Sequence, residues 1–350
     1  MNHPHTNSEA VTGHSSPAAA SGSSVISSDS PFTLHPSPFT VSPLPRLIII
    51  QGPTATGKSE LAVRLARQFD GEIVGADSLQ LYRGMEIGTA APEPELRSQV
   101  PHHLLGIVDP AASFTAADFA GEAGEAIAGI HRRGRIPFVV GGTGLYIRAL
   151  LGGLIQAPAG DDTLRGELAA WAERDGWGAL LEELERIDPE TAARLHPNDR
   201  GRIIRALEVC RLTGIPFSLM THAHGFSDIR YTTLKIGLTG ERAQLYRRVE
   251  ERVDRMLAGG FVDEVRGLLA RGYSPELKSM RSIGYKEICR YLSGEISINE
   301  VAELIKRDTR RYLKRQQTWF FRDTATKWFE YPENFASIHC AVEKFIASSP

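Results

Sequence analysis

The chain has 350 residues, which suggests about two domains, and its charges nearly cancel, with 40 Lys and Arg against 42 Asp and Glu. This balance excludes a uniformly basic protein, although a local basic patch is compatible with it. No apolar run reaches the ~20 residues that a membrane-spanning helix needs. The three cysteines lie far apart, which excludes a disulfide framework and a zinc-binding spacing. We therefore expect a globular protein of a reducing, cytoplasmic compartment, without a membrane partner.

Residues 1–44 differ in composition from the rest of the chain. They contain 11 Ser and 6 Pro and neither Lys nor Arg. Such a segment cannot bury enough apolar surface to offset the entropy of ordering it, so we predict a disordered tail. A secretory signal would need a basic region and a continuous apolar core, and the tail has neither. Whether it is a functional tail or a mis-assigned start is left open.

A glycine-rich loop follows the first apolar segment, 46–50, which is typical of a buried parallel strand. The loop matches G-x-x-x-x-G-K-[ST] without exception, and apolar residues at helical spacing follow it over 60–69. In this context the loop N–H groups and the helix N-terminus bind a diphosphate or polyphosphate. Lys58 is expected to reach the terminal phosphate, and the Ser59 hydroxyl to hold Mg²⁺. The predicted phosphate-binding residues are Gly52, Pro53, Thr54, Ala55, Thr56, Gly57, Lys58 and Ser59.

Two further apolar segments, 72–76 and 136–140, each end in polar residues. Asp77 follows the first, and Thr143 stands among three glycines after the second. Ligands of doubly wound sheets bind outside the carboxyl ends of the strands, so both residues are expected to face the P-loop. Asp77 is placed for general-base catalysis or metal binding, and equally for capping a helical turn. The glycines around Thr143 permit close approach of a ligand, or they mark a tight turn.

The order of the elements predicts the architecture. Strand-like segments alternate with helical ones, which indicates an α/β fold: a P-loop-type parallel sheet core with an inserted all-helical subdomain. The predicted strands are 46–50, 72–76, 136–140 and 234–238. The predicted insertion helices are 161–174, 177–187 and 199–212, with Gly201 a poor helix former at the start of the last one. The predicted parts are the tail 1–44, the core 45–154 with 221–330, the insertion 155–220, and a C-terminal extension 331–350.

A basic segment compensates locally for the neutral overall charge. Between positions 306 and 322, Asp308 is the only acid, and three basic residues share one helical face at 307, 311 and 314. The basic residues are Lys306, Arg307, Arg310, Arg311, Lys314, Arg315 and Arg322. With the aromatic residues at 319–321 they are typical of a surface that follows phosphates and stacks bases, or of a solvated helix over core aromatics. We expect Trp319 in the core.

Seven motifs in this order resemble those of bacterial tRNA dimethylallyltransferases, over about residues 46–325. They are GPTATGKS, DSLQLYRGMEIGTAAP, PHHLLGIVDP, GGTGLY, NDRGRIIRALEV, RSIGYKE and KRQQTW. The resemblance implies that a dimethylallyl group moves from dimethylallyl diphosphate to N6 of adenine 37, in tRNAs that read codons beginning with U. The P-loop, with Mg²⁺, would then hold the diphosphate of the prenyl donor. A monomer is expected, with the insertion closing over the anticodon loop.

The resemblance also implies roles for individual residues. Asp77 would be the general base, Thr143 would contact the diphosphate or the adenine, and Gln80 would read the adenine edge. Arg165 matches a substrate-contacting position by weaker local similarity, or it is a solvent-facing helix arginine. The helix at 242–256, with Arg248, Arg252 and Arg255, would lie near the diphosphate. The implied tRNA-binding residues are Asp77, Ser78, Leu79, Gln80, Gly201, Arg202, Ile203, Ile204, Arg205, Arg281, Ser282, Gly284, Tyr285, Lys286, Lys314, Arg315 and Gln316.

Three other functions are compatible with parts of the pattern. A nucleotide or metabolite kinase is a common use of a P-loop beside an inserted lid, but it leaves the basic segment unexplained. A dimethylallyltransferase acting on AMP or ATP would share the P-loop and Asp77 without needing an RNA-binding face. An RNA-binding protein that only hydrolyses nucleoside triphosphates gives no reason for Asp77 and Thr143 to share one mouth.

Overall fold

The computed structural model of the chain describes residues 44–225 and 228–348. All described elements belong to the second of two units, which spans residues 43–350. The predicted disordered tail therefore lies outside the described residues, except for residue 44.

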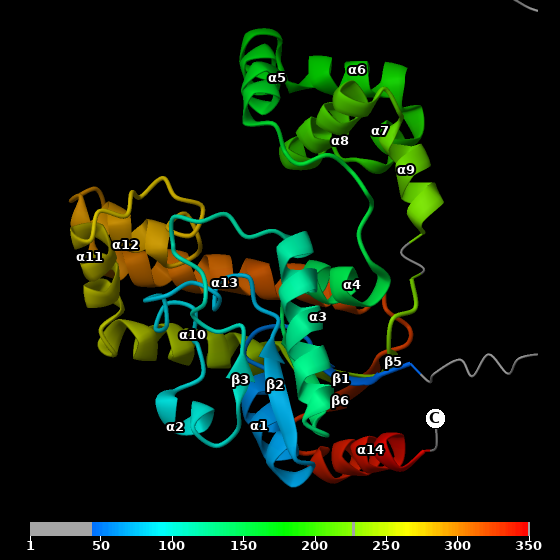
Figure 1. The fold of residues 1–350 in the computed structure, drawn as a ribbon. Coiled ribbons are helices and arrows are strands. Elements are labelled where there is room, and N and C mark those ends of the chain that lie inside the picture. Colours follow the sequence, from blue (N-terminus) through cyan, green and yellow to red (C-terminus); the bar gives the residue numbers. More distant parts are fainter. Residues whose placement is uncertain (1–43, 226–227, 349–350) are drawn as a thin grey trace, which may run out of the picture. The chain divides into compact units, whose positions relative to one another are not determined.

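A six-stranded sheet with every pair parallel forms the centre of the second unit (Figure 1). Its order is β3-β2-β4-β1-β5-β6. The strands are β1 Arg46–Gln51, β2 Gly71–Gly75, β3 His102–His103, β4 Ile136–Gly141, β5 Thr232–Thr239 and β6 Lys327–Glu330. The predicted fold class and all four predicted strands are confirmed. Sequence analysis missed the two edge strands, because two and four residues are too short to produce a recognisable period.

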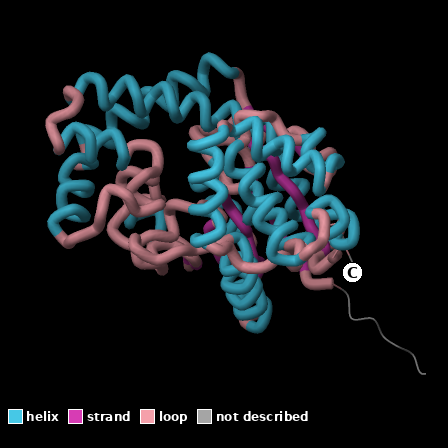
Figure 2. Tube along the Cα trace, turned by 90° about the horizontal axis from the view of Figure 1, so that it is seen from above, coloured by secondary structure: helices cyan, strands magenta, loops and turns pink. Residues whose placement is uncertain are grey.

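Helices cover both faces of the sheet (Figure 2), which explains why β1 is apolar at consecutive positions. Leu47 and Ile49 pack with α3, Ala116–Arg132, α4, Gly144–Gly152, and α13, Ile298–Phe320. Ile48 and Ile50 point to the other face, where α1, Lys58–Gln68, and α14, Phe335–Ala347, lie. Alternate side chains of one strand thus enter two separate clusters.

Further helices complete the core on the first of these faces. They are α10 Arg242–Ala258, α11 Phe261–Ala270 and α12 Tyr285–Leu292, and each contributes buried side chains to the cluster that contains Leu47. The short α2, Pro94–Arg97, precedes β3. Two ion pairs join α13 to α10, from Lys306 to Asp254 at 2.7 Å and from Arg310 to Glu250 at 2.5 Å.

Between α4 and β5 the described chain contains helices and no strand. These helices are α5 Asp162–Asp175, α6 Trp177–Ile187, α7 Pro189–Arg194, α8 Arg200–Thr213 and α9 Phe217–His224. They gather around a core of their own, with Leu168, Leu180, Leu184 and Leu207 fully buried. The three predicted insertion helices are confirmed within one residue at each end. Gly201 lies in the first turn of α8, where a poor helix former is tolerated.

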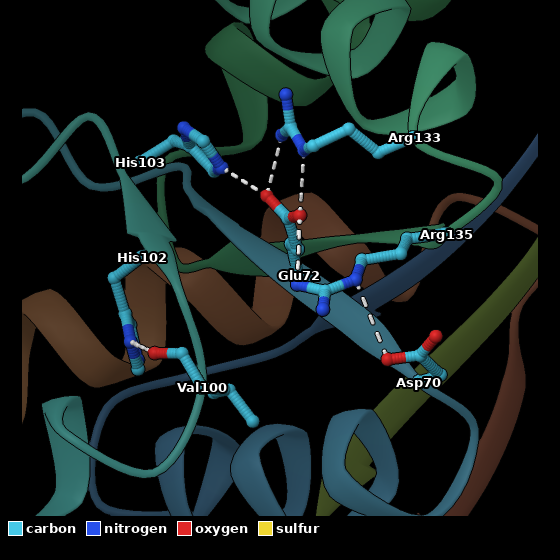
Figure 3. A network of polar contacts seen from close by, with 7 residues as sticks. All are labelled: Asp70, Glu72, Val100, His102, His103, Arg133 and Arg135. Carbon is cyan, nitrogen blue, oxygen red and sulfur yellow. Dashed lines mark hydrogen bonds and ion pairs between the residues drawn. The ribbon is translucent and has the colours of Figure 1, made fainter.

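A buried carboxylate joins β2 to its neighbours on the α3 face (Figure 3). Glu72 receives two hydrogen bonds from Arg133, at 2.9 and 2.6 Å, and one from Arg135 at 3.2 Å. The His103 imidazole Nε2 lies 2.7 Å from the same carboxylate and connects the edge strand β3. Hydrogen bonds from Arg133, opposed by burial, lower the pKa of Glu72 from 4.5 to about 2. The folded state therefore stabilises the ionised form of the Glu72 carboxyl group.

Replacement of Glu72 by Gln tests this network. At pH 7 we expect the free energy of unfolding to fall by about 3 kcal/mol, because three cationic or imidazole partners lose a buried charge. A lowered folded-state pKa means that the stabilisation exists above pH 4.5 and is lost as the pH falls towards 2. The difference from wild type should therefore shrink on acidification. Denaturant unfolding at several pH values measures it.

Asp70→Asn is the matched control, because Asp70 pairs with the same Arg135 at 3.4 Å but is 80% exposed. Its effect should stay below about 0.5 kcal/mol. An equal loss in both variants at pH 7, or a Glu72→Gln difference that does not change with pH, would contradict the proposed role of the buried charge.

Candidate active site

The P-loop lies at the carboxyl end of β1 in a conformation that requires glycine. Gly52 has φ 139°, and a Cβ there would lie 2.5 Å from the Leu238 carbonyl oxygen of β5. Gly57 has φ 85° and lies against the ring of Tyr331. The loop is closed by hydrogen bonds to the Pro53 carbonyl, from the Thr56 hydroxyl at 2.9 Å and from the Lys58 ammonium at 2.5 Å. These hydrogen bonds, within the loop and its first helical turn, hold the loop in a defined conformation.

Two cations meet at the mouth of this loop. The Arg252 guanidinium, from α10, donates to the Thr54 hydroxyl at 3.2 Å. Burial and the positive charge of Arg252 lower the pKa of Lys58 to about 7, while the charge of Asp77 opposes this. Burial also lowers the pKa of Arg252. A bound anion would relieve this mutual repulsion, so the mouth favours a phosphate ligand. The expectation that α10 lies near the phosphate site is supported through Arg252.

Asp77 and Thr143 follow the carboxyl ends of the neighbouring strands β2 and β4 and line the same opening of the candidate active site. One carboxylate oxygen of Asp77, Oδ1, accepts from the Leu79 and Gln80 amides at 2.9 and 3.4 Å. The Thr143 hydroxyl accepts from the Ser78 amide at 3.0 Å, which joins the two loops. Asp77 thus caps a turn and also faces the P-loop. Its Oδ2 has no hydrogen bond from the described residues, and this atom can act on a ligand.

Gln316 is not on the RNA-facing surface where the motif comparison put it. It is buried, and its side-chain oxygen accepts from the Thr54 amide at 2.9 Å. Its side-chain nitrogen donates to the Gly142 carbonyl at 3.0 Å. Both polar atoms are occupied, so Gln316 joins the P-loop to the Thr143 turn. Leu313, Gln316 and Phe320 follow one another at helical spacing, and all three are buried. The apolar Leu313 and Phe320 on either side of Gln316 are the sequence signal that could have indicated its burial.

Two more implied RNA-binding residues are buried, so that expectation is wrong for them. Tyr285 is fully buried, and its hydroxyl donates to Glu264 at 2.6 Å. Gly284, with φ 94°, lies against the ring of Phe261. Glu264 also accepts from the amides of Ile87 and Gly88, at 2.7 and 3.0 Å. The contacts of Glu264 with Tyr285, Ile87 and Gly88 therefore hold the loop that follows Asp77 in place. Sequence analysis did not identify Glu264.

The neighbours of these residues differ in exposure. Arg281 is exposed, with no ion-pair partner in the described part of the chain. The Ser282 hydroxyl donates to the Ser279 carbonyl at 2.6 Å. Lys286 is half-exposed and pairs with Glu287 at 3.3 Å and Asp308 at 3.5 Å. In this segment Arg281 is thus the group available to an anionic partner.

The loop after Asp77 uses part of its hydrogen-bonding capacity internally. The Gln80 side-chain nitrogen lies 3.2 Å from the Thr89 and the Ala90 carbonyl oxygens and donates to them. Leu79 packs against the core, and the Ser78 hydroxyl accepts from Thr143 at 3.3 Å. Gln80 can therefore offer its carbonyl oxygen, but not a free amide nitrogen, to an adenine edge.

The implied residues of the insertion divide into a buried set and an exposed set. Ile203 is fully buried in the insertion core and cannot contact RNA, and Ile204 is partly buried there. Arg202 is exposed and pairs with Asp199 at 3.3 Å, and its neighbour Gly201 is also exposed. Arg202 is therefore the charged group that this segment offers to RNA.

Arg165 and Arg205 share one buried carboxylate. They bind Glu208 at 2.9 and 2.5 Å, and Glu208 also accepts from the Asp161 amide at 2.7 Å. Arg205 further donates to the Pro158 carbonyl at 2.8 Å. These contacts fix the connector that enters the insertion. The structure does not bring Arg165 to Lys58 or Asp77, and its substrate contact stays a prediction.

The basic segment on α13 is partly used within the protein. Lys306 and Arg310 face acids of α10, and Arg307 and Arg311 pair with Asp308 at 2.9 and 3.3 Å. The remaining basic residues are exposed and have no ion-pair partner among the described residues. They are Lys314, Arg315 and Arg322.

Trp319 was expected in the core, and this was wrong. It is 38% exposed, while its neighbour Phe320 is buried. The indole edge lies against Gly144, directly after Thr143, where a side chain would overlap it. The missing Cβ allows the ring to lie at the surface beside the active site.

The oxygen donors at the P-loop fit Mg²⁺. The Ser59 hydroxyl, at the N-terminus of α1, and Oδ2 of Asp77 are hard ligands without hydrogen bonds from the described residues. The described residues contain no cluster of three or more His, Cys, Asp or Glu that could hold a metal. Mg²⁺ usually takes one or two protein ligands together with substrate phosphates and waters. Among the described helices, none has the length and hydropathy to cross a bilayer.

Comparisons with known proteins agree with this geometry. The IPP transferase family model matches residues 80–323, and an isopentenyl transferase model matches 45–100. A tRNA dimethylallyltransferase 2 of Geotalea uraniireducens is 62% identical, over 86% of this chain and 97% of its own. The tRNA dimethylallyltransferase of Geobacter sulfurreducens is 59% identical, over 86% and 96%.

Two solved structures are similar in fold. A tRNA isopentenylpyrophosphate transferase from Bacillus halodurans has a TM-score of 0.64 and 41% identity, and the match covers 86% of this chain and 96% of that one. A eukaryotic dimethylallyltransferase acting on tRNA has a TM-score of 0.74 and 28% identity, with 87% and 80% covered.

Gln316→Met should separate a bridge from an RNA contact. The change keeps the side-chain length but removes both hydrogen bonds, so pyrophosphate affinity should fall about tenfold and RNA affinity by less than about twofold. Lys314→Gln is the reciprocal control, since loss of one phosphate contact should weaken RNA binding about fivefold at ~0.1 M salt. Calorimetry with pyrophosphate and anisotropy with labelled RNA measure the two affinities. If Gln316→Met lost more affinity for RNA than for pyrophosphate, Gln316 would be an RNA contact and not a bridge between the two loops.

Proposed function

This chain belongs to the IPP transferase family, and from this premise we propose that it transfers a dimethylallyl group to N6 of adenine 37 in tRNAs reading codons that begin with U. The donor would be dimethylallyl diphosphate. The observation that carries the proposal is that a formed P-loop with two cations, Lys58 and Arg252, opens onto Asp77 and Thr143. A site for a leaving diphosphate thus adjoins a site for a nucleophile that must lose a proton.

The first part of the reaction concerns the leaving group. The bond between C1 of the dimethylallyl group and the diphosphate oxygen breaks, and the diphosphate leaves with the electron pair. Lys58, Arg252 and the P-loop amides would bind the charge that develops on this oxygen. Because these donors are already in place, little reorganisation is needed during the reaction. Mg²⁺ bound through Ser59 would supply further neutralisation of the diphosphate.

The second part concerns the acceptor. The adenine N6 forms the new bond to C1 and releases one proton. Asp77 would accept it at Oδ2, because Oδ1 already accepts from two backbone amides. Thr143 would contact the reacting groups through its hydroxyl. Since Asp77 and Thr143 are held by the same loop contacts, their spacing is set before the RNA arrives.

The remaining contacts concern the tRNA. We propose that the exposed residues Arg202, Arg281, Lys314 and Arg315 contact its phosphates, and that the insertion, residues 155–220, closes over the anticodon loop to exclude water. Arg165 would then contribute to substrate binding. We further propose that the enzyme acts as a monomer. The three cysteines are free, which supports a reducing cytoplasmic setting.

One assay tests the reaction against its alternatives. The protein is mixed with Mg²⁺, labelled dimethylallyl diphosphate and an unmodified tRNA that reads U-initial codons. Parallel reactions contain AMP, and a tRNA with another base at position 37. Label in the first tRNA alone is the expected result. Label in AMP would indicate a free-nucleotide dimethylallyltransferase, and ATP consumption without label transfer would indicate a kinase.

Asp77→Asn tests the general base. Asn keeps an oxygen that can cap the turn but cannot accept the proton, so turnover should fall by about 10²–10⁴. tRNA affinity should change by less than about threefold, because the loop is retained. Single-turnover transfer and equilibrium binding measure the two effects. Near wild-type turnover would exclude Asp77 as the base.

The lowered pKa of Lys58 predicts a pH dependence of diphosphate binding. The bound anion favours the protonated amine, so binding should take up a proton above pH ~7, and affinity should fall as the pH rises. Lys58→Arg provides the reference, because its guanidinium stays charged and its pH profile contains only the titration of pyrophosphate. Relative to this reference, wild-type affinity should fall about tenfold from pH 6 to pH 8. Parallel profiles would contradict the pKa of about 7.

A further inference from the structure

A cavity of about 550 Å³ lies beside the candidate active site. Its walls come from α4, the end of α13 and the residues that follow it, the start of β5, and residues 225 and 228–231 of the connector that leads from the helical insertion back to the sheet. Gly144, the residue after Thr143, belongs to its lining, so the cavity adjoins the reacting groups. Its volume is sufficient for a small organic ligand. Gly144 and Trp319 belong to the motifs GGTGLY and KRQQTW, but the roles assigned above to those motifs do not include this cavity.

An aromatic ring forms one wall. Trp319 is 38% exposed and lines the cavity, and its indole edge is held against Gly144. A large, partly exposed ring that is fixed along one edge is the usual platform for a nucleic-acid base, because every base presents an apolar face. An apolar core residue would not remain exposed to this extent.

The charged groups of the cavity are predominantly basic. They are the bases Arg148, Arg230, Lys235 and Arg322 and the acids Asp228 and Asp323. Lys235 pairs with Asp323 at 2.8 Å and Arg230 with Asp228 at 3.2 Å, so both acids are neutralised. Arg322 has no ion-pair partner within the described ranges. A phosphate fits this balance, because an arginine can bind it through two parallel hydrogen bonds.

Together these features select one ligand class. An isoprenoid tail would leave the arginine without a partner, and a free anion would not use the exposed ring. A nucleotide uses both, with its base on Trp319 and its phosphate on Arg322. The position next to Thr143 matches a nucleotide that neighbours the reacting one in the strand.

We propose that this cavity binds one nucleotide of the RNA loop adjacent to the reacting adenosine, with its base stacked on Trp319 and its phosphate on Arg322. This inference rests on the proposed RNA substrate. The reacting base must leave its stack before it enters the active site, and its neighbour then loses a stacking partner. Trp319 replaces that partner, which lowers the cost of extruding the target.

Binding experiments that need no catalysis test the inference. The probe is a stem–loop RNA with the target adenine in its loop, together with versions that carry an abasic residue at one loop position each. Trp319→Leu should weaken binding of the intact RNA about tenfold. One abasic position should weaken wild-type binding by a similar factor and have little further effect in Trp319→Leu, because the two changes remove the same contact. Trp319→Phe should retain most of the affinity.

Arg322→Gln provides an independent readout that depends on a surface residue. It should reduce the slope of log affinity against log salt by about one. Arg67→Gln, which removes an exposed arginine on α1, is the matched control and should leave the slope unchanged.

Three results would overturn the inference: unchanged affinity in Trp319→Leu, additive effects at every abasic position, or an Arg322→Gln slope equal to wild type. Loss of affinity in Arg322→Gln without any abasic coupling would show an anion-binding cavity and would also overturn it. The coupling can be observed even if no dimethylallyl group is transferred, so failure of the proposed reaction and failure of this inference are distinguishable.

Discussion

The side-chain amide of Gln316 holds together three segments that are far apart in the sequence. Its oxygen fixes the P-loop at Thr54, and its nitrogen fixes the turn at Gly142, which precedes Thr143. The amide is buried, so neither partner could be satisfied by water without a loss of packing. Gln316 of α13 therefore helps to set the spacing between the P-loop and the turn that carries Thr143. The same helix exposes Lys314 and Arg315, so the surface that we propose to bind RNA and the residue that joins the two loops of the candidate active site lie on one helix.

The electrostatics of the mouth follow from this arrangement. Lys58, Arg252 and Asp77 lie close enough for their charges to interact, and the charge of Arg252 together with burial lowers the pKa of Lys58. Burial first, and then the negative charge of Asp77, raise the pKa of the Tyr312 hydroxyl on α13. The site thus holds an excess of positive charge at the diphosphate end and a carboxylate at the nucleophile end. A diphosphate reduces the repulsion on the first side without neutralising the carboxylate on the second.

Sequence patterns predicted the elements that are long and periodic. The P-loop was found from its motif, and the four central strands and the insertion helices were found because each has enough apolar residues to form a recognisable pattern. The edge strands β3 and β6 were not found, since their two and four residues contain no period. The motifs assigned Gln316 and Tyr285 to RNA binding, but both side chains are buried. Successive helix residues differ in direction by about 100°, so the exposed Lys314 and the buried Gln316 belong to different faces. A motif indicates which residues act together, but it does not indicate which of them are buried.

The exposed position of Trp319 and the number of unpaired cations in the basic segment both depend on contacts with distant residues. The sequence did not reveal these contacts. Acids of α10 and Asp308 neutralise four of the seven basic residues in this segment. The three that remain, Lys314, Arg315 and Arg322, lie towards the end of the helix where Trp319 is held against Gly144. A nearly neutral protein can therefore attract a polyanion, because its internal ion pairs leave the uncompensated cations at one place. That place adjoins Thr143, so in the proposed complex the cations that bind the RNA would also bring the strand to the active site.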